Sequence, residues 1–200
     1  MLHRTLLLSL ACVSVLSGCG EQAPPRPEGV EVALTPGLPD PEAGRSLRWS
    51  PYGKQLPLVA EEGGLVAELS LGAEGPPFRL LLSKSGASPY YDQLGVDRNH
   101  DGRFEQDEIL TTEPSESRNK FWSSFEAELD LPVTDPFTGE ASLNPYPLGF
   151  WYVEDPRVEE TDTVLRFSRD GWMEGVVTLD GVEAGVMVTE NAMDGVFDRE

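Results

Sequence analysis

The chain has 200 residues, of which 35 are acidic and 15 are basic, and its formal net charge is −20 at pH 7. Such a charge repels nucleic-acid phosphates and anionic lipid headgroups, so no nucleic-acid partner is expected. Both cysteines, Cys12 and Cys19, lie near the amino terminus, and His100 is the one histidine after them. Beyond residue 19 this composition excludes a cysteine nucleophile, a thiolate cluster and a multi-histidine zinc site.

The first nineteen residues have the order of an export signal. A basic start, with Arg4, precedes an apolar run over residues 6–16, which is too short to span a bilayer. The run ends in Leu16-Ser17-Gly18-Cys19, which resembles the lipobox of bacterial lipoproteins. The resemblance implies export, cleavage before Cys19 and a lipid on its sulfur that attaches the chain to a membrane of the cell envelope. In a diderm bacterium it implies the outer membrane, because Gly20 and not Asp follows the cysteine.

Residues 20–46 form the next segment and are rich in proline. Proline lacks a backbone donor and favours extended conformations, and apolar residues in this segment are sparse. We therefore expect a disordered, semi-rigid tether that takes no part in a core. Its prolines are Pro24, Pro25, Pro27, Pro36, Pro39 and Pro41.

Residues 47–200 are predicted to form one β-rich domain. Between Phe121 and Leu131 the odd positions are mostly apolar and the even positions mostly polar, which is the period of a half-buried strand. The pairs Asp170-Gly171 and Asp180-Gly181 are hairpin signals, so the last strands are expected to form a meander. The fold class is all-β, with sandwich-like antiparallel sheets. The predicted strands are 65–71, 78–84, 90–96, 121–131, 146–153, 163–168, 172–179 and 182–189.

Aromatic residues are frequent in this domain, notably in Gly149-Phe150-Trp151-Tyr152. They would suit a platform for carbohydrate or peptide. We interpret them instead as core residues, because aromatic side chains at strand spacing bury large areas.

A loop at residues 97–108 carries the clearest chemistry. Oxygen-bearing side chains stand at its first, third and fifth positions, glycine stands sixth, and a carboxylate stands twelfth. Calcium takes six to eight oxygen ligands, and this spacing wraps a short backbone around such an ion. The candidate metal ligands are Asp97, Asn99, Asp101, the carbonyl of Arg103, Glu105 and Glu108.

This stretch resembles the calcium loop of EF-hand proteins over twelve residues. It departs from that family at position eight, where Phe104 replaces the usual aliphatic residue, so pairing with a second loop is in doubt. The flanking segments contain Pro89, Gly95 and Pro114 and do not favour long helices. We therefore expect a structural calcium clip and not a sensor that opens a pair of helices.

A weaker copy of the loop occupies residues 190–200. Asp194-Gly195 stands where Asp101-Gly102 stands in the first loop, but Ala192 offers no side-chain oxygen at position three. The copy is either a vestigial turn or a sign that the sequence is the front of a longer protein. The two copies hint at two β-subdomains. In the longer-protein case, the chain weakly resembles the leading part of exported proteins that end in a thioredoxin-like domain.

Two functional classes remain open from the sequence. The first is a lipid-anchored, calcium-stabilised envelope protein with a binding or scaffolding role and an unknown protein or glycan partner. The second is an enzyme that uses only carboxylates, such as a glycan hydrolase. A pocket lined by two carboxylates would favour the enzyme. Ser117-Arg118-Asn119-Lys120 matches a Ser-x-x-Lys pattern, but the companion motifs are missing, so we interpret it as a chance match.

Overall fold

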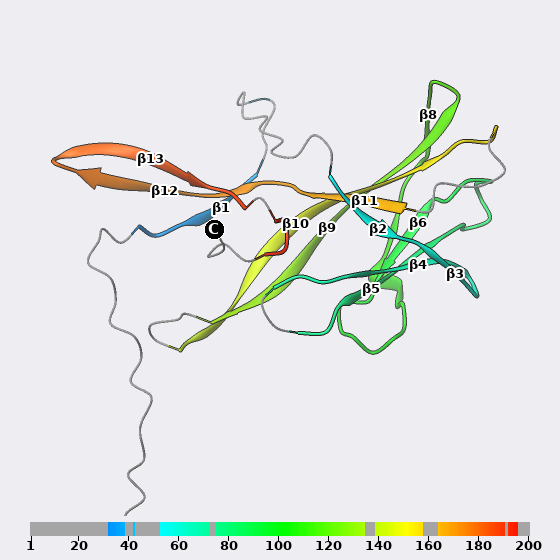
Figure 1. Cartoon of the computed structure of the whole chain (residues 1–200), viewed down its shortest axis with the longest axis horizontal. Coiled ribbons are helices and arrows are strands. Elements are labelled where there is room, and N and C mark those ends of the chain that lie inside the picture. Colours follow the sequence, from blue (N-terminus) through cyan, green and yellow to red (C-terminus); the bar gives the residue numbers. More distant parts are fainter. Residues whose placement is uncertain are drawn as a thin grey trace, which may run out of the picture.

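The structure is a computed structural model, and it describes residues 32–38, 42, 53–72, 75–134, 139–157, 164–190 and 192–195. The predicted signal segment, Cys19 and most of the predicted tether lie outside these residues. Within them the fold is all-β, as the sequence predicts, and the strands form three antiparallel sheets (Figure 1).

The first sheet is a five-stranded meander in chain order. Its strands are β3 (Val59–Glu61), β4 (Gly64–Leu69), β5 (Phe78–Ser83), β6 (Gln93–Val96) and β7 (Ile109–Thr111). The second sheet also has five strands, and its spatial order is β2 (Lys54–Pro57), β11 (Val164–Arg169), β10 (Ala141–Glu154), β9 (Lys120–Thr134) and β8 (Ser115–Ser117). The third sheet contains β1 (Thr35–Gly37), β12 (Trp172–Leu179) and β13 (Val182–Val188).

One hydrophobic core joins the first and second sheets face to face, which makes the sandwich that the sequence predicts. Along β9 the odd positions from 123 to 131 are buried and the even positions from 124 to 130 are exposed. Along β10 the even positions from 146 to 152 are buried. The core residues with the least exposure are Leu80, Leu82, Leu94, Val96, Tyr152 and Leu165.

The third sheet corrects the expected meander of the last three strands. β11 belongs to the sandwich, whereas β12 and β13 leave it as a ribbon that projects from the rest of the molecule (Figure 1). The turn at Asp180-Gly181 is a hairpin, as predicted, and both residues have positive φ. The turn at Asp170-Gly171 instead carries the chain from one sheet to another, because β1 occupies the place beside β12.

β1 lies within the segment that composition assigned to the tether. Thr35–Gly37 pairs with Trp172–Glu174 of β12, so this part of the segment is a strand. Pro36 is tolerated because β1 is an edge strand. Gly37 fits against Trp172, since an added Cβ would lie 2.4 Å from the indole Nε1 atom.

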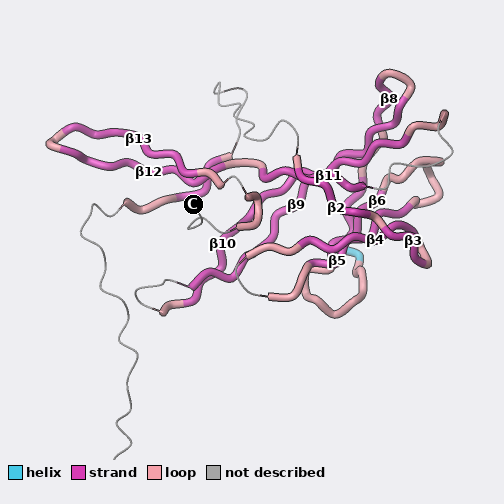
Figure 2. The backbone as a smooth tube through the Cα atoms, in the orientation of Figure 1, coloured by secondary structure: helices cyan, strands magenta, loops and turns pink. Residues whose placement is uncertain are grey.

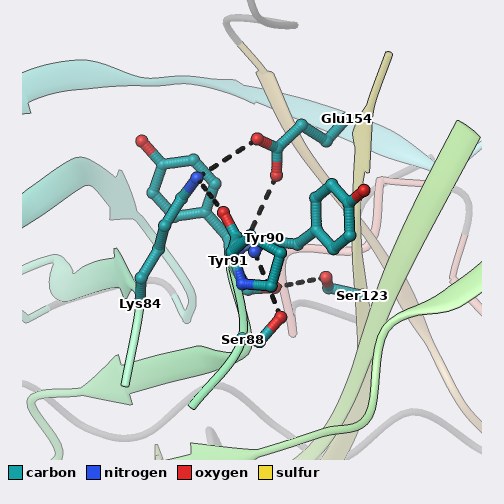
Figure 3. A network of polar contacts seen from close by, with 7 residues as sticks. Lys84, Ser88, Tyr90, Tyr91, Ser123 and Glu154 are labelled. Carbon is teal, nitrogen blue, oxygen red and sulfur yellow. Dashed lines mark hydrogen bonds and ion pairs between the residues drawn. The ribbon is translucent and has the colours of Figure 1, made fainter. Parts of the chain in front are cut away.

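A polar joint connects the two sheets of the sandwich at the β5–β6 connection (Figure 3). Lys84 Nζ lies 3.3 Å from a carboxylate oxygen of Glu154 and donates to the carbonyl of Pro89 at 2.5 Å. The Ser123 hydroxyl of β9 donates to the carbonyl of Tyr91. The Tyr90 ring stacks on Phe121, with 3.6 Å between ring centroids. These contacts fix the start of β6, and therefore the loop that follows it, against the second sheet.

A matched pair of leucines tests the sandwich. Leu129 in β9 is 1% exposed and Leu143 in β10 is 64% exposed. Leu129→Ala is expected to lower the free energy of unfolding by about 3 kcal/mol, because it leaves a cavity in the core. Leu143→Ala is expected to change it by less than about 0.5 kcal/mol. Urea unfolding of both variants would measure the difference, and equal losses would contradict the assignment of faces in the β9–β10 hairpin.

Candidate metal site

The predicted calcium loop is the connection of the β6–β7 hairpin. β6 ends at Val96, β7 begins at Ile109, and the two strands pair through Gln93–Thr111, Leu94–Leu110 and Gly95–Ile109. A single 3₁₀ turn, η1 (Gln106–Glu108), closes the loop and is the cyan segment in Figure 2. Both flanks of the loop are therefore strands.

Asp97 organises the first half of the loop from a buried position. It is 3% exposed, and its N–H donates to the carbonyl of Arg79 in β5 at 3.0 Å. Its carboxylate accepts the N–H of Asp101 at 3.1 Å and the N–H of Gly102 at 3.0 Å. The reversal between them needs a left-handed backbone at Gly102, where φ is 79°.

Glu108 holds the neck of the loop from the opposite end. It is 4% exposed, although it is a glutamate on a hairpin connection. One carboxylate oxygen accepts the N–H of Arg98 at 2.9 Å and that of Asn99 at 3.4 Å. The other accepts the N–H of Glu105 at 3.2 Å. Glu108 thus ties the start of the loop to its end.

The other predicted ligands lie at the surface. Asn99 Oδ1 accepts the N–H of Asp101 at 2.9 Å, and Asp101 Oδ1 accepts the N–H of Arg103 at 2.8 Å. The side chains of Asn99, Asp101, Arg103 and Glu105 are all exposed. In the described parts of the chain, no three side chains of the His, Cys, Asp and Glu types gather where they could hold a metal. The structure therefore buries the carboxylates of positions one and twelve and leaves those of positions five and nine outside.

The donor chemistry of the loop fits a hard cation. An ionised carboxylate has about four lone-pair sites, and the two buried carboxylates together receive five backbone N–H groups. Lone pairs remain for an ion. Among the residues that the structure describes, no lysine or arginine forms an ion pair with Asp97 or Glu108. All the potential ligands are oxygens, which calcium prefers.

Two aromatic contacts hold the loop on the first sheet, and sequence reasoning missed both. The Phe104 ring lies over Gly95 in β6, where an added Cβ would come within 2.6 Å of the ring. The His100 ring packs on Phe78, with 4.7 Å between centroids. Position eight therefore packs on its own sheet. A glycine two residues before Asp97 is the sequence signal that could have indicated this contact.

The copy of the loop near residue 190 repeats the hydrogen bonding of the first. Glu190 stands at position one, and one oxygen of its carboxylate accepts the N–H of Asp194 at 3.0 Å and that of Gly195 at 2.6 Å. Gly195 has the same φ as Gly102, 79°. The resemblance seen in the sequence is thus a shared turn geometry. Residues 191 and 196–200 lie outside the described residues.

The two loops differ in what neutralises the first carboxylate. Glu190 Oε1 accepts from the Tyr146 hydroxyl at 2.5 Å and lies 3.4 Å from Arg169 Nη1, and the side chains of Arg169 and Glu190 are 6% and 2% exposed. Burial, followed by the hydrogen bond to Glu190, raises the pKa of the Tyr146 phenol well above its ordinary value. Burial lowers the pKa of Arg169, while Glu190 raises it. An arginine therefore supplies the positive charge at the second loop.

The Ser-x-x-Lys match and the surface pockets were the other candidates for an active site. Ser117-Arg118-Asn119-Lys120 is the β8–β9 hairpin turn, in which Ser117 pairs with Lys120 and the central residues have φ values of 55° and 59°. Two pockets of about 390 and 480 Å³ lie on the described surface. Among the described lining residues, the first has no carboxylate and the second has one, that of Glu174, so these residues do not form the carboxylate pair of a hydrolase.

Comparisons with protein-family models, curated proteins and solved structures found no match. Within the described ranges, no helix has the length and hydrophobicity needed to cross a membrane.

The Glu190 cluster yields a stability prediction. Glu190→Ala removes the partner of a buried arginine and the acceptor of two N–H groups, so we expect a loss of about 3 kcal/mol in the free energy of unfolding. Glu183→Ala is the control, because Glu183 is exposed on β13. Urea unfolding at pH 7 would measure both. A loss no larger for Glu190→Ala than for Glu183→Ala would show that the cluster does not hold the loop.

Proposed function

We propose that this protein binds one calcium ion through residues 97–108 and uses it as a structural clip across the β6–β7 hairpin. The observation that carries the proposal is the burial of two carboxylates, Asp97 and Glu108, at the two ends of one loop. Burying an ionised carboxylate is costly unless charge and hydrogen bonds compensate it. Backbone N–H groups supply the hydrogen bonds, and a divalent cation would supply the charge.

Asp97 and Glu108 would hold the ion together with Asn99, Asp101, the carbonyl of Arg103 and Glu105. The bound cation would offset the mutual repulsion of the acidic side chains. A chain with a net charge of −20 gains from such neutralisation wherever acids cluster.

A clip suits the flanks of the loop better than a sensor does. A sensor EF-hand converts ion binding into a change of angle between two helices. Here the flanks are β6 and β7, which are hydrogen-bonded to each other, and β6 also pairs with β5. An ion at this loop would rigidify a hairpin of the sandwich and would leave its strand pairing unchanged.

The second loop is a poor calcium site, which supports a stoichiometry of one calcium ion per chain. Its position-one carboxylate, Glu190, already has Arg169 at 3.4 Å, and Ala192 provides no oxygen at position three. A cation there would compete with a buried arginine. We therefore assign calcium to the first loop alone.

We further propose that the protein is exported and anchored to the cell envelope through lipid on Cys19, where it has a binding or scaffolding role. This rests on the order of the first nineteen residues and on the Leu16–Cys19 motif. In that location the loop would be exposed to calcium outside the cell. Extracellular calcium-binding modules have dissociation constants of about 10⁻⁴ to 10⁻³ M.

Calorimetry on the full chain tests the calcium site. We expect one calcium ion per chain with a dissociation constant of about 10⁻⁴ to 10⁻³ M. Glu108→Gln is expected to abolish the binding heat, because it removes a buried charge from the ligand set. Asp107→Asn is the matched control, since Asp107 is an exposed neighbour outside the predicted ligands, and it should bind as the wild type does. Equal heats from all three proteins would refute the site.

Metabolic labelling with palmitate in a bacterial host tests the anchor. We expect label in the wild type and in Cys12→Ser, and no label in Cys19→Ser, because only Cys19 follows the lipobox residues. Label that persists in Cys19→Ser would contradict the anchor and leave the calcium proposal untouched.

A further inference from the structure

The second sheet carries a pocket on the face that is turned away from the core. Trp122 pairs with Val153, and Trp151 pairs with Arg166, so these four side chains share one face of β9, β10 and β11. The core residues Phe150 and Tyr152 alternate with them on the opposite face. The pocket measures about 390 Å³, and its lining residues are Ser117, Arg118, Lys120, Trp122, Trp151, Val153 and Arg166.

The charge of this pocket is opposite to that of the chain. Among the described residues that line it, three are basic and none is acidic, although acids outnumber bases by 35 to 15 in the sequence. Two of the three have partners, because Lys120 Nζ lies 3.4 Å from Asp155 and Arg166 also takes part in an interaction within the chain. The same Asp155 is bound at 2.8 Å by Arg157, whose side-chain hydrogen bonds hold the pKa of Asp155 well below its ordinary range.

Arg118 is placed at a conformational cost. It is the first central residue of the β8–β9 turn, and its φ is 55°. Turns of this kind favour Asn, Asp or Gly, and a bulky side chain in the left-handed region is disfavoured. Strained residues concentrate at functional sites. The side chain kept at this strained position lines the pocket and brings a cation to it.

The polar groups around the pocket are mainly donors. Arginine and lysine donate and do not accept, and the Trp122 indole N–H is buried without an acceptor among the described residues. A neutral sugar would need carboxylate or amide acceptors, and none of the described lining residues has such a side chain. The two indole rings and Val153 form the apolar part of the lining. The complementary ligand has an anionic, acceptor-rich group attached to a ring that has an apolar face.

We propose that this pocket binds a small organic anion in which a carboxylate is joined to a ring that has an apolar face, with the ring on Trp122 and Trp151 and the carboxylate toward Arg118. Aromatic acids and ring-shaped sugar acids share this chemistry. The site is independent of the calcium loop, which belongs to the first sheet.

Nitrogen-15 NMR of the full chain tests the proposal, because its four tryptophans give four indole N–H signals. The probes are 2-naphthoate, its neutral analogue 2-naphthamide, ring-free acetate and a trimer of galacturonate. We expect 2-naphthoate or the galacturonate trimer to shift the signals of Trp122 and Trp151, identified with Trp122→Phe and Trp151→Phe. Whichever of the two binds more tightly identifies the source of the ring. Both 2-naphthamide and acetate should bind at least about tenfold more weakly than that ligand.

Arg118→Gly is the decisive variant. Glycine suits a positive φ, so the turn and the fold are kept while the cation is lost. We expect affinity for the bound acid to fall about fivefold or more, and Arg118→Lys to restore part of it. Arg79→Ala, which removes a half-exposed arginine from β5 of the first sheet, should bind as the wild type does. The proposal is overturned if neither acid shifts Trp122 or Trp151, if 2-naphthamide or acetate binds as tightly as the acid, or if Arg118→Gly binds as the wild type does.

Discussion

The first and second sheets must each hide one face from water, and the rest of the architecture depends on that constraint. Because side chains alternate along a strand, a slip of β10 by one residue against β9 would turn Phe150 outward and Trp151 inward. The hydrophobic core therefore fixes the register of the hairpin, and the register fixes which aromatic residues form the outer pocket. The polar joint around Lys84 and Glu154 then sets where β6, and the loop after it, begins.

The same turn is used twice at the ends of strands, with different neutralising charges. In both loops a carboxylate at position one accepts the N–H groups of positions five and six, and a left-handed glycine makes the reversal. At Glu190 the balancing charge comes from Arg169 in β11, which joins the segment 192–195 to the sandwich. At Asp97 the proposed balancing charge is a calcium ion. A side-chain cation is always present at the Glu190 loop, whereas the proposed ion would make the Asp97 loop depend on the calcium concentration around it.

The two faces of the second sheet divide the aromatic residues by role. Five of the eight aromatic residues in this sheet belong to the core, namely Phe125, Tyr146, Phe150, Tyr152 and Phe167. Trp122 and Trp151 lie outside it among arginine and lysine side chains. The interpretation of Gly149–Tyr152 as core residues is therefore right for Phe150 and Tyr152 and does not hold for Trp151. The alternation seen in the sequence already placed Trp122 on the face opposite Phe125.

The period of apolar residues and the chemistry of turns are local properties of a sequence. They were enough to predict the all-β class, the strand at 121–131, the Asp180-Gly181 hairpin and the non-helical flanks of the 97–108 loop. Partners distant in the chain were not predictable. The pairing of β1 with β12, the separation of β11 from β12, the Arg169–Glu190 pair and the gathering of Trp122, Trp151 and Arg118 join residues from different segments. Side-chain alternation says that a face is buried and neither which strand lies beside it nor what covers it, so strand pairing and sheet packing in the tertiary structure decided these contacts.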